Sequence, residues 1–270
     1  KLWSSTETSS PFAPIPRMTD VPLLLSNLQK AIRRQLVRVA ARTALELAHA
    51  DINALARRLT IIAVEDVRPN AHITTCTWIM TTFGSKKYTP TQADAIWLVQ
   101  YAQVLASDFT RVEPTKCPGP IASLWRRANV RGDSVALALL VRASFGGMTG
   151  DIAMLVAAAQ ENHLNCPTFD WPKDEVQRLD AGDILHEAVD FHCQPSLVDE
   201  LRMLYDLSEK EITHAIWNCS SKLNTRGVDL DPPTPVYEKI AMQLHVLQKA
   251  RITRSFSSVS SASRPPVVSG

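Results

Sequence analysis

Apolar and polar residues follow the spacing of amphipathic helices along most of the chain. Leu55, Leu59, Ile62 and Asp66, for example, recur at intervals of four, three and four residues and so share one helix face. The long alternating runs of Val, Ile and Tyr that favour strands do not occur. We therefore expect an all-α multi-helix array, with helices over residues 20–36, 37–49, 51–67, 71–83, 90–109, 120–129, 133–145, 149–162, 182–192, 195–206, 208–222 and 235–252.

Three local signals mark the beginnings of helices. Asp51 is a suitable N-cap, because its side-chain oxygen can accept a hydrogen bond from a free N–H group of the first turn. The run from Thr89 to Gln92 offers a capping threonine, a proline at the first helical position and a glutamine at the third. Ser208 and Glu211 have the spacing of a capping box, so we expect a helix to begin there as well.

Composition divides the chain into two helical lobes and two tails. Residues 1–19 and 255–270 are rich in Ser, Thr and Pro and show no helical period, so both are expected to be irregular. Residues 111–120 contain three prolines and a glycine and are the best internal boundary. We expect one lobe at residues 20–112 and a second at 113–254.

Glycine is scarce, with nine residues in 270. Phosphate-binding loops and tight hairpins use glycine because it adopts positive φ, so few of them are expected. The motifs GxxxxGK[ST], GxGxxG, HExxH and GxSxG are absent. We expect no cofactor and no ATP hydrolysis. With 45% apolar and 21% charged residues, the composition is that of a globular protein and excludes disorder throughout.

The formal net charge is only +2, so any basic surface is expected to be local. Five widely spaced cysteines without a CxxC pair favour a reducing compartment such as the nucleus, the cytoplasm or an organelle matrix. No apolar run reaches the roughly 18 residues of a membrane span, and residues 1–16 lack the apolar core of a signal peptide. Because the chain begins at Lys1, we expect a processed product or a fragment.

Cations gather in a few short segments. Five arginines between residues 17 and 42 make the N-terminal region basic, and residues 125–127 and 222–226 combine cations with aromatic or polar side chains. Such segments contact phosphates and bases in nucleic-acid-binding proteins, although solvated helix faces have the same composition. If the chain binds nucleic acid, we expect contacts from Arg38, Arg42, Trp125, Arg126, Arg127, Lys222 and Arg226.

Glu65 and Asp66 place two adjacent carboxylates at the end of an apolar helix. The C-terminus is the negative end of the helix dipole, and an unpaired buried charge costs several kcal/mol, so these groups need cations. A catalytic carboxylate pair is the alternative. We favour an ionic lock between helices, formed by Arg57, Arg58, Glu65 and Asp66 with Arg33, Arg34, Lys86 and Lys87.

The segments 29–34, 44–47 and 56–67 together resemble the helical C-terminal region of MgsA/RarA-type AAA+ proteins, which are clamp-loader relatives. In that family, K-x-I-R, A-L and A-R-R-L-x-x-x-A-x-E-D elements follow in this order. The resemblance covers residues 28–106; the ATPase module is missing, and Arg68 stands where the family has glycine. It implies a helical domain for oligomerisation and partner contact near DNA, without ATP-driven activity.

His186, His192 and Cys193 are residue types that bind zinc and lie close in the sequence. The two histidines are six residues apart and share no helix face, and no fourth ligand is evident, so we expect no metal site. Cys193 would also lack an oxyanion hole as a nucleophile.

Three functions are consistent with these patterns. The first is a non-catalytic helical interaction protein with protein partners or a homo-oligomeric state, serving as a DNA replication or repair accessory factor. The second is a structural subunit of a large assembly, such as an organellar ribosome or a membrane-associated complex. The third is a helical enzyme centred on Glu65 and Asp66 or on His186, His192 and Cys193.

Overall fold

The computed structural model describes residues 18–83, 88–108, 110, 121–172, 176–189, 195–216 and 235–262. These residues form helices and no strand, which confirms the all-α prediction. The elements are α1 (Val21–Arg33), α2 (Val37–Glu65), α3 (Ile73–Phe83), α4 (Gln92–Ser107), α5 (Ile121–Arg131), α6 (Ser134–Ser144), α7 (Thr149–Ala158), the 3₁₀ turns η1 (Ala181–Asp183) and η2 (His186–Ala188), α8 (Pro195–Tyr205), α9 (Glu209–Ile216) and α10 (Pro235–Ala262).

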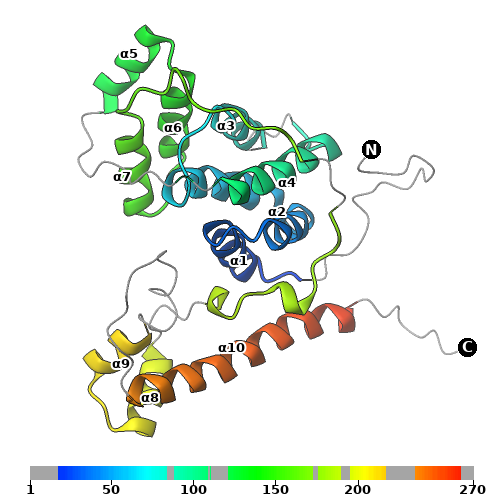
Figure 1. The fold of residues 1–270 in the computed structure, drawn as a ribbon, viewed down its shortest axis with the longest axis vertical. Coiled ribbons are helices and arrows are strands. Elements are labelled where there is room, and N and C mark those ends of the chain that lie inside the picture. The colour runs from blue at the N-terminus through cyan, green and yellow to red at the C-terminus, as the bar shows by residue number, and fades with distance from the viewer. Residues whose placement is uncertain are drawn as a thin grey trace, which may run out of the picture.

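Helices α1 to α4 form the centre of the molecule (Figure 1). α2 packs against the other three, and its residues 59–64 are all buried. Leu55, Leu59 and Ile62 lie fully inside, as their shared helix face predicts. Because α2 is enclosed on several sides, the charged residues at its end lie next to other helices rather than in open solvent.

Asp51 divides α2 into two segments. Its φ of −159° and ψ of 90° are extended, and its carboxylate accepts a hydrogen bond from the Ala54 N–H at 2.9 Å. This is the N-cap that the sequence predicts at this position. The two helices expected over 37–49 and 51–67 therefore follow one another directly, with a kink at the cap, and together make up α2.

The beginning of α4 differs from the prediction. Its N-cap is Thr91 instead of Thr89, and Asp94 completes the capping box by accepting from the Thr91 N–H at 2.7 Å. Tyr88 Oη also donates to Asp94 at 2.7 Å. A carboxylate accepts these hydrogen bonds more strongly than the neutral side chain of Gln92 would, so the cap lies two residues further along.

Helices α6 and α7 form a hairpin that packs on α2 and α3, and α5 lies across its far end (Figure 1). Asp133 caps α6 by accepting the Ala136 N–H at 3.0 Å. The chain after α7 returns towards α3 and α4, where Gln100 donates to the Pro172 carbonyl at 3.1 Å. The boundary predicted at residues 111–120 lies outside the described residues.

Residues 176–189 form a strap against α1 and α2 that contains the two 3₁₀ turns. The Asn27 side chain of α1 donates to the Asp183 carbonyl at 3.1 Å and accepts from the Leu185 N–H at 2.8 Å. The helix expected over 182–192 is therefore wrong in its described part, because these tertiary hydrogen bonds engage backbone groups that a helix would pair internally. Residues 190–194 lie outside the described range.

Helices α8, α9 and α10 lie at the end of the molecule opposite α5 (Figure 1). The capping box predicted before α9 is present, since the Ser208 N–H donates to the Glu211 carboxylate at 2.9 Å and the Glu211 N–H to Ser208 Oγ at 3.4 Å. Within the described residues, no helix combines the length and the apolar character that crossing a bilayer requires.

The Ser-rich end of α10 is helical as far as Ala262, which corrects the irregular tail expected from residue 255. Ser255 Oγ and an Arg251 terminal nitrogen both donate to the Asp20 carboxylate, at 3.2 and 3.4 Å. These contacts tie α10 to the beginning of α1. Tertiary contact thus extends the helix into a stretch whose composition favours irregular structure.

Candidate functional site

Glu65 and Asp66, at the end of α2, contact one arginine of α1. Arg33 Nε donates to Asp66 Oδ1, and Arg33 Nη2 lies 3.4 Å from Glu65 Oε1. The Asp66 side chain is fully buried, whereas 37% of the Glu65 side chain is exposed. This ion pair joins the C-terminal ends of α1 and α2 through Arg33, one of the cations that the sequence-based hypothesis places opposite the two carboxylates.

Gln29 completes the contact, although its neutral side chain gives no charge signal in the sequence. Its Nε2 donates to Glu65 Oε2 at 2.7 Å and to Asp66 Oδ2 at 3.0 Å, and its Oε1 accepts from Arg58 Nη1 at 3.3 Å. Gln29 lies four residues before Arg33 on α1, and this spacing is the signal that could have identified it. Arg58 is thereby connected to the carboxylates through an intermediate amide.

Burial and the neighbouring Asp66 raise the pKa of Glu65, while Arg33 and Gln29 act in the opposite direction. A carboxyl group with a raised pKa is a candidate general acid. The groups that contact Glu65, however, are a guanidinium and an amide, and neither exchanges protons at neutral pH. This environment favours a structural role for the pair.

Two arginines expected in the lock have other partners. Arg34 forms an ion pair with Glu187 of η2, and Arg57 donates to the Phe145 carbonyl at 3.3 Å. Successive residues of a helix point about 100° apart, so the neighbours of Arg33 and Arg58 face different elements. This corrects the expected membership of the lock. Lys86 and Lys87 lie outside the described residues.

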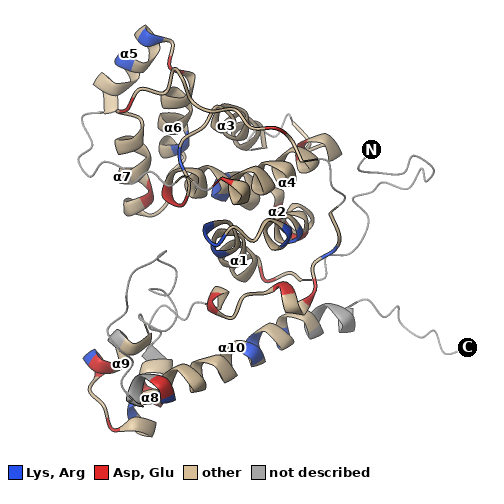
Figure 2. Cartoon of the chain, viewed as in Figure 1, with Lys and Arg blue, Asp and Glu red and all other residues tan. Residues whose placement is uncertain are grey.

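The outer face of α5 presents Trp125, Arg126 and Arg127. Leu124 and Ala128 of the same helix are buried, whereas Trp125 is 36% exposed and both arginines are exposed. α5 contains no acidic residue, and the basic residues drawn blue along it in Figure 2 are arginines. Cations beside an aromatic ring are suited to phosphates and bases.

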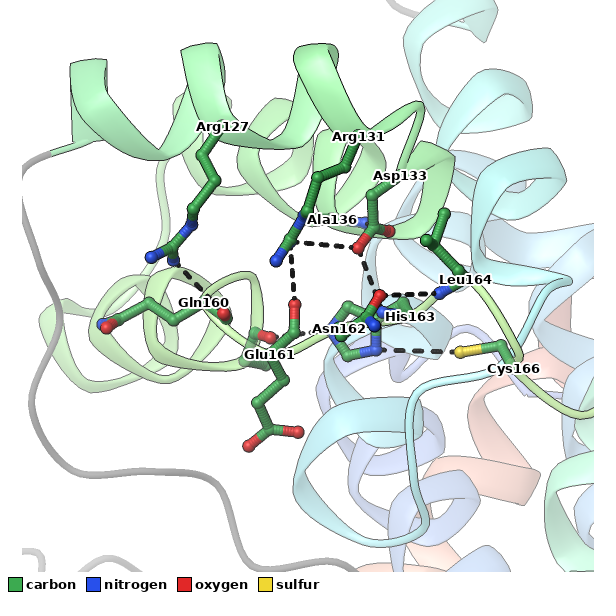
Figure 3. A network of polar contacts seen from close by, with 11 residues as sticks. Arg127, Arg131, Asp133, Ala136, Gln160, Glu161, Asn162, His163, Leu164 and Cys166 are labelled. Atoms are coloured by element: carbon green, nitrogen blue, oxygen red, sulfur yellow. Dashed lines mark hydrogen bonds and ion pairs between the residues drawn. The ribbon is translucent and has the colours of Figure 1, made fainter.

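Two arginines of α5 attach it to the α6–α7 hairpin, as Figure 3 shows. Arg127 donates to the Gln160 carbonyl at 3.2 Å, and Arg131 donates to the Glu161 carbonyl at 3.1 Å and to Asp133 at 3.2 Å. These contacts fix the helix against the turn after α7. The exposed face of α5 is therefore held on a supported element rather than on a loop.

Asp133, His163 and Cys166 lie together in the same network (Figure 3), but their geometry is not that of a catalytic triad. Asp133 accepts from the backbone N–H of His163 at 3.0 Å, and the ring Nε2 lies 2.7 Å from the Ala158 carbonyl oxygen. Cys166 Sγ lies 3.7 Å from the ring Nδ1. Because burial raises the pKa of Cys166, its thiol stays protonated at neutral pH. The three residues hold the turn after α7.

Arg42 is occupied inside the protein, which corrects its expected contact with nucleic acid. Its guanidinium lies 2.9 Å from Asp183 and also binds Gln177 of the strap, and only 13% of its side chain is exposed. Arg38, one turn earlier on α2, is exposed and stays a candidate contact. Lys222 and Arg226 lie outside the described residues.

The His186 ring stacks on that of His245 in α10, with centroids 3.9 Å apart. Stacked rings do not direct two nitrogens towards one metal ion. The described residues hold no group of three or more His, Cys, Asp or Glu side chains that could hold a metal. His192 and Cys193 lie outside the described residues, so the proposed cluster is represented by His186 alone.

Comparison of the chain with protein-family models, with curated proteins and with solved structures found no match. The resemblance of residues 28–106 to the helical region of MgsA/RarA-type proteins therefore stays a prediction.

Proposed function

We propose that the chain is a non-catalytic helical interaction protein that binds nucleic acid through α5, as a DNA replication or repair accessory factor does. The observation that carries the proposal is the outer face of α5, where Trp125, Arg126 and Arg127 are exposed on a helix without acidic residues. Tryptophan stacks on bases, and arginine binds phosphates. The resemblance to clamp-loader-related helical regions points in the same direction.

The surroundings of the reactive side chains support a role without catalysis. Glu65 and Asp66 bind Arg33 and Gln29, as an interhelical contact does. Burial raises the pKa of Cys76 to about 12 and also raises that of Cys166, so neither thiol is a ready nucleophile.

Salt-dependent DNA binding tests the proposal. Fluorescence anisotropy with labelled duplex and single-stranded DNA should show affinity falling steeply between about 50 and 200 mM salt, because bound cations release counterions from the phosphates. Replacing Arg126 and Arg127 by Gln should reduce the slope of log affinity against log salt by about two, roughly one for each phosphate contact. Trp125→Ala should weaken binding to single strands more than to duplex, because it removes base stacking.

The matched control is the double substitution Lys249→Gln and Arg254→Gln, which removes the same charge from exposed positions on α10. It should leave the salt slope unchanged. A flat salt response of the unmodified chain would refute the proposal, as would an equal loss of slope in the two double variants.

A different observation favours a structural subunit of a large assembly as a second function. Large apolar side chains of α8 and α10 are exposed, namely Met203 (83%), Leu204 (56%), Met242 (71%) and Val246 (61%). Met242 and Val246 lie four residues apart on one face of α10, and a contiguous exposed apolar surface marks a contact site. Purification of the native protein with and without Met242→Glu and Val246→Glu tests this function. A fixed set of co-purifying proteins, lost in the variant, supports it; a monomer without partners contradicts it.

A further inference from the structure

A hollow of about 390 Å³ lies where α2 meets the loop between α6 and α7. Three arginines line it, namely Arg57 and Arg58 of α2 and Arg142 of α6. Leu25 of α1 and Met148, before α7, add apolar surface. The lining therefore combines a strongly cationic side with an apolar side, which is the character of a site for an amphiphilic anion.

Arg142 is the most buried of the three arginines, with 4% of the residue exposed. Its Nε donates to the Arg57 carbonyl at 3.2 Å and its Nη1 to the Gly146 carbonyl at 2.8 Å. Both acceptors are uncharged, and no ion pair joins Arg142 to a carboxylate of the described residues. Burial, and then repulsion by Arg57, lower the pKa of Arg142. A buried cation in this state is costly to the fold, which an anionic ligand would offset.

Arg57 and Arg58 also bind uncharged acceptors. Arg57 donates to the Phe145 carbonyl, and Arg58 donates to the Gln29 amide oxygen, each at 3.3 Å. Arg57 is exposed and Arg58 is half-buried, so solvent reaches part of this cationic lining. Like charges gathered at one point repel one another, and an anion between them relieves that repulsion.

The N-terminus of α7 opens on the same hollow, which Gly147, Met148 and Asp151 help to line. Met148 is the N-cap residue and makes no side-chain cap. The first N–H groups of this ten-residue helix therefore add partial positive charge to the three guanidiniums. Gly147 has a φ of +147°, a conformation that other residues rarely adopt, so glycine permits this turn beside Arg142.

Two carboxylates line the hollow as well. Asp51 is engaged as the cap of the second half of α2, and Asp151 lies in the first turn of α7. Asp151 raises the pKa of Arg142 but does not reverse the lowering that burial and Arg57 cause. Three guanidiniums and two carboxylates give the side chains of the lining a net positive charge. The partial positive charge at the N-terminus of α7 adds to it.

We propose that this hollow binds the phosphate group of a small phosphomonoester. The guanidiniums of Arg57, Arg58 and Arg142 contact the phosphate oxygens, and the ligand's organic part lies against Leu25 and Met148. Guanidinium groups match oxyanions with paired hydrogen bonds, and helix N-termini favour phosphate. A phosphomonoester carries about −1.5 to −2 charge at pH 7, more than a carboxylate or a phosphodiester.

The size and shape of the hollow favour a small molecule over a nucleic-acid strand. Its volume lies near the lower end of the roughly 300–1,000 Å³ that small-molecule pockets occupy. A strand requires cations along an extended groove, whereas these arginines line a single hollow. The hollow and the outer face of α5 lie at opposite ends of the α6–α7 hairpin, about 15 Å apart along α6. The two sites can therefore be tested separately.

Calorimetric titration of the full chain with inorganic phosphate and with phenyl phosphate, in chloride buffer near pH 7.5, tests the proposal. Both probes should bind, and phenyl phosphate should bind several-fold more tightly because its ring contacts Leu25 and Met148. Arg57→Gln should weaken phenyl phosphate about tenfold through the loss of a charge-assisted contact. Arg57 is exposed, so this variant should keep its fold.

Two further variants make the test specific. Arg142→Gln should weaken binding by more than about tenfold, since it removes the buried guanidinium. Asp151→Asn should strengthen binding several-fold, because it removes a carboxylate that competes with the ligand. A merely structural role for Asp151 predicts no such gain.

Arg254→Gln, at an exposed position on α10, is the matched control and should leave phenyl phosphate binding unchanged. Unchanged affinity in Arg57→Gln, weaker binding in Asp151→Asn, or no advantage of phenyl phosphate over inorganic phosphate would each overturn the proposal. Loss of DNA binding in the α5 variants with phenyl phosphate binding retained would separate this site from the proposed nucleic-acid contact.

Discussion

The two ends of the α6–α7 hairpin hold arginine in opposite ways. At the α5 end, Arg131 lies 3.2 Å from Asp133, whose carboxylate also accepts two backbone N–H groups. At the other end, Arg142 is more buried, yet it binds two carbonyl oxygens and lies close to Arg57. The first arrangement is neutralised within the chain and stabilises the fold. The second keeps a buried positive charge, which we assign to a ligand.

The same distinction applies to the rest of the helical core. Several arginines are each paired with a carboxylate whose side chain is almost or fully inaccessible, and all of these pairs except Arg131 with Asp133 join segments far apart in the sequence. Burial alone therefore does not separate structural from ligand-binding arginines, whereas the charge of the partner does. The paired set is Arg33 with Asp66, Arg42 with Asp183, Arg68 with Asp108, Arg131 with Asp133 and Arg178 with Glu46.

The largest effect is expected from Asp133→Ala. The substitution removes the cap of α6, leaves the His163 N–H without its acceptor and leaves Arg131 without its carboxylate. We expect a loss of about 4 kcal/mol in the free energy of unfolding, measured by urea denaturation. Asp199→Ala, at an exposed position on α8, is the control and should change this value by less than about 0.5 kcal/mol. A small loss in Asp133→Ala would remove the contrast between the two ends.

A second expected difference separates the two carboxylates at the end of α2. Asp66→Asn leaves Arg33 beside a buried neutral side chain, without its carboxylate partner. It should lower the free energy of unfolding by about 3 kcal/mol. Glu65→Gln should cost less than about 1 kcal/mol at pH 7, because Glu65 is partly exposed and its ionised form is disfavoured by burial.

The pH dependence gives this second prediction its sign. Because the pKa of Glu65 is raised in the folded state, its contribution to stability is complete below its ordinary value of 4.5 and is lost as the pH rises through the folded pKa. Glutamine does not titrate. The difference in unfolding free energy between Glu65→Gln and the unmodified protein should therefore change in favour of the variant as the pH rises from 4 to 7. Equal losses in both variants at pH 7 would contradict this difference.

The smallest expected effect is the difference in stability between variants of the two hairpin arginines, Arg131 and Arg142. In phosphate-free buffer, Arg131→Gln should cost about 2 kcal/mol because it leaves the Asp133 carboxylate without its cation. Arg142→Gln should cost about 1 kcal/mol, since the lost carbonyl contacts are partly offset by relief of repulsion from Arg57. Thermal unfolding of the two variants side by side checks the order. A larger loss in Arg142→Gln would mean that its role is structural.

Part of the candidate site is visible in the sequence. Two carboxylates at a helix C-terminus require a cation, and Arg33 stands among the few cations placed to supply it. Gln29 carries no charge and gives no such signal. Arg142 contacts a residue 85 positions away, and nothing in its local sequence indicates that the two would meet.

What the sequence determined by itself is the helical class, the caps at Asp51 and Ser208, and the enclosed face of α2. These features depend on residues within about four positions of one another, where helix geometry is fixed. Only the tertiary structure decided that residues 181–183 and 186–188 form 3₁₀ turns, that α10 continues to Ala262 and that three arginines line one hollow. Those outcomes depend on packing between distant segments, which a local pattern does not encode.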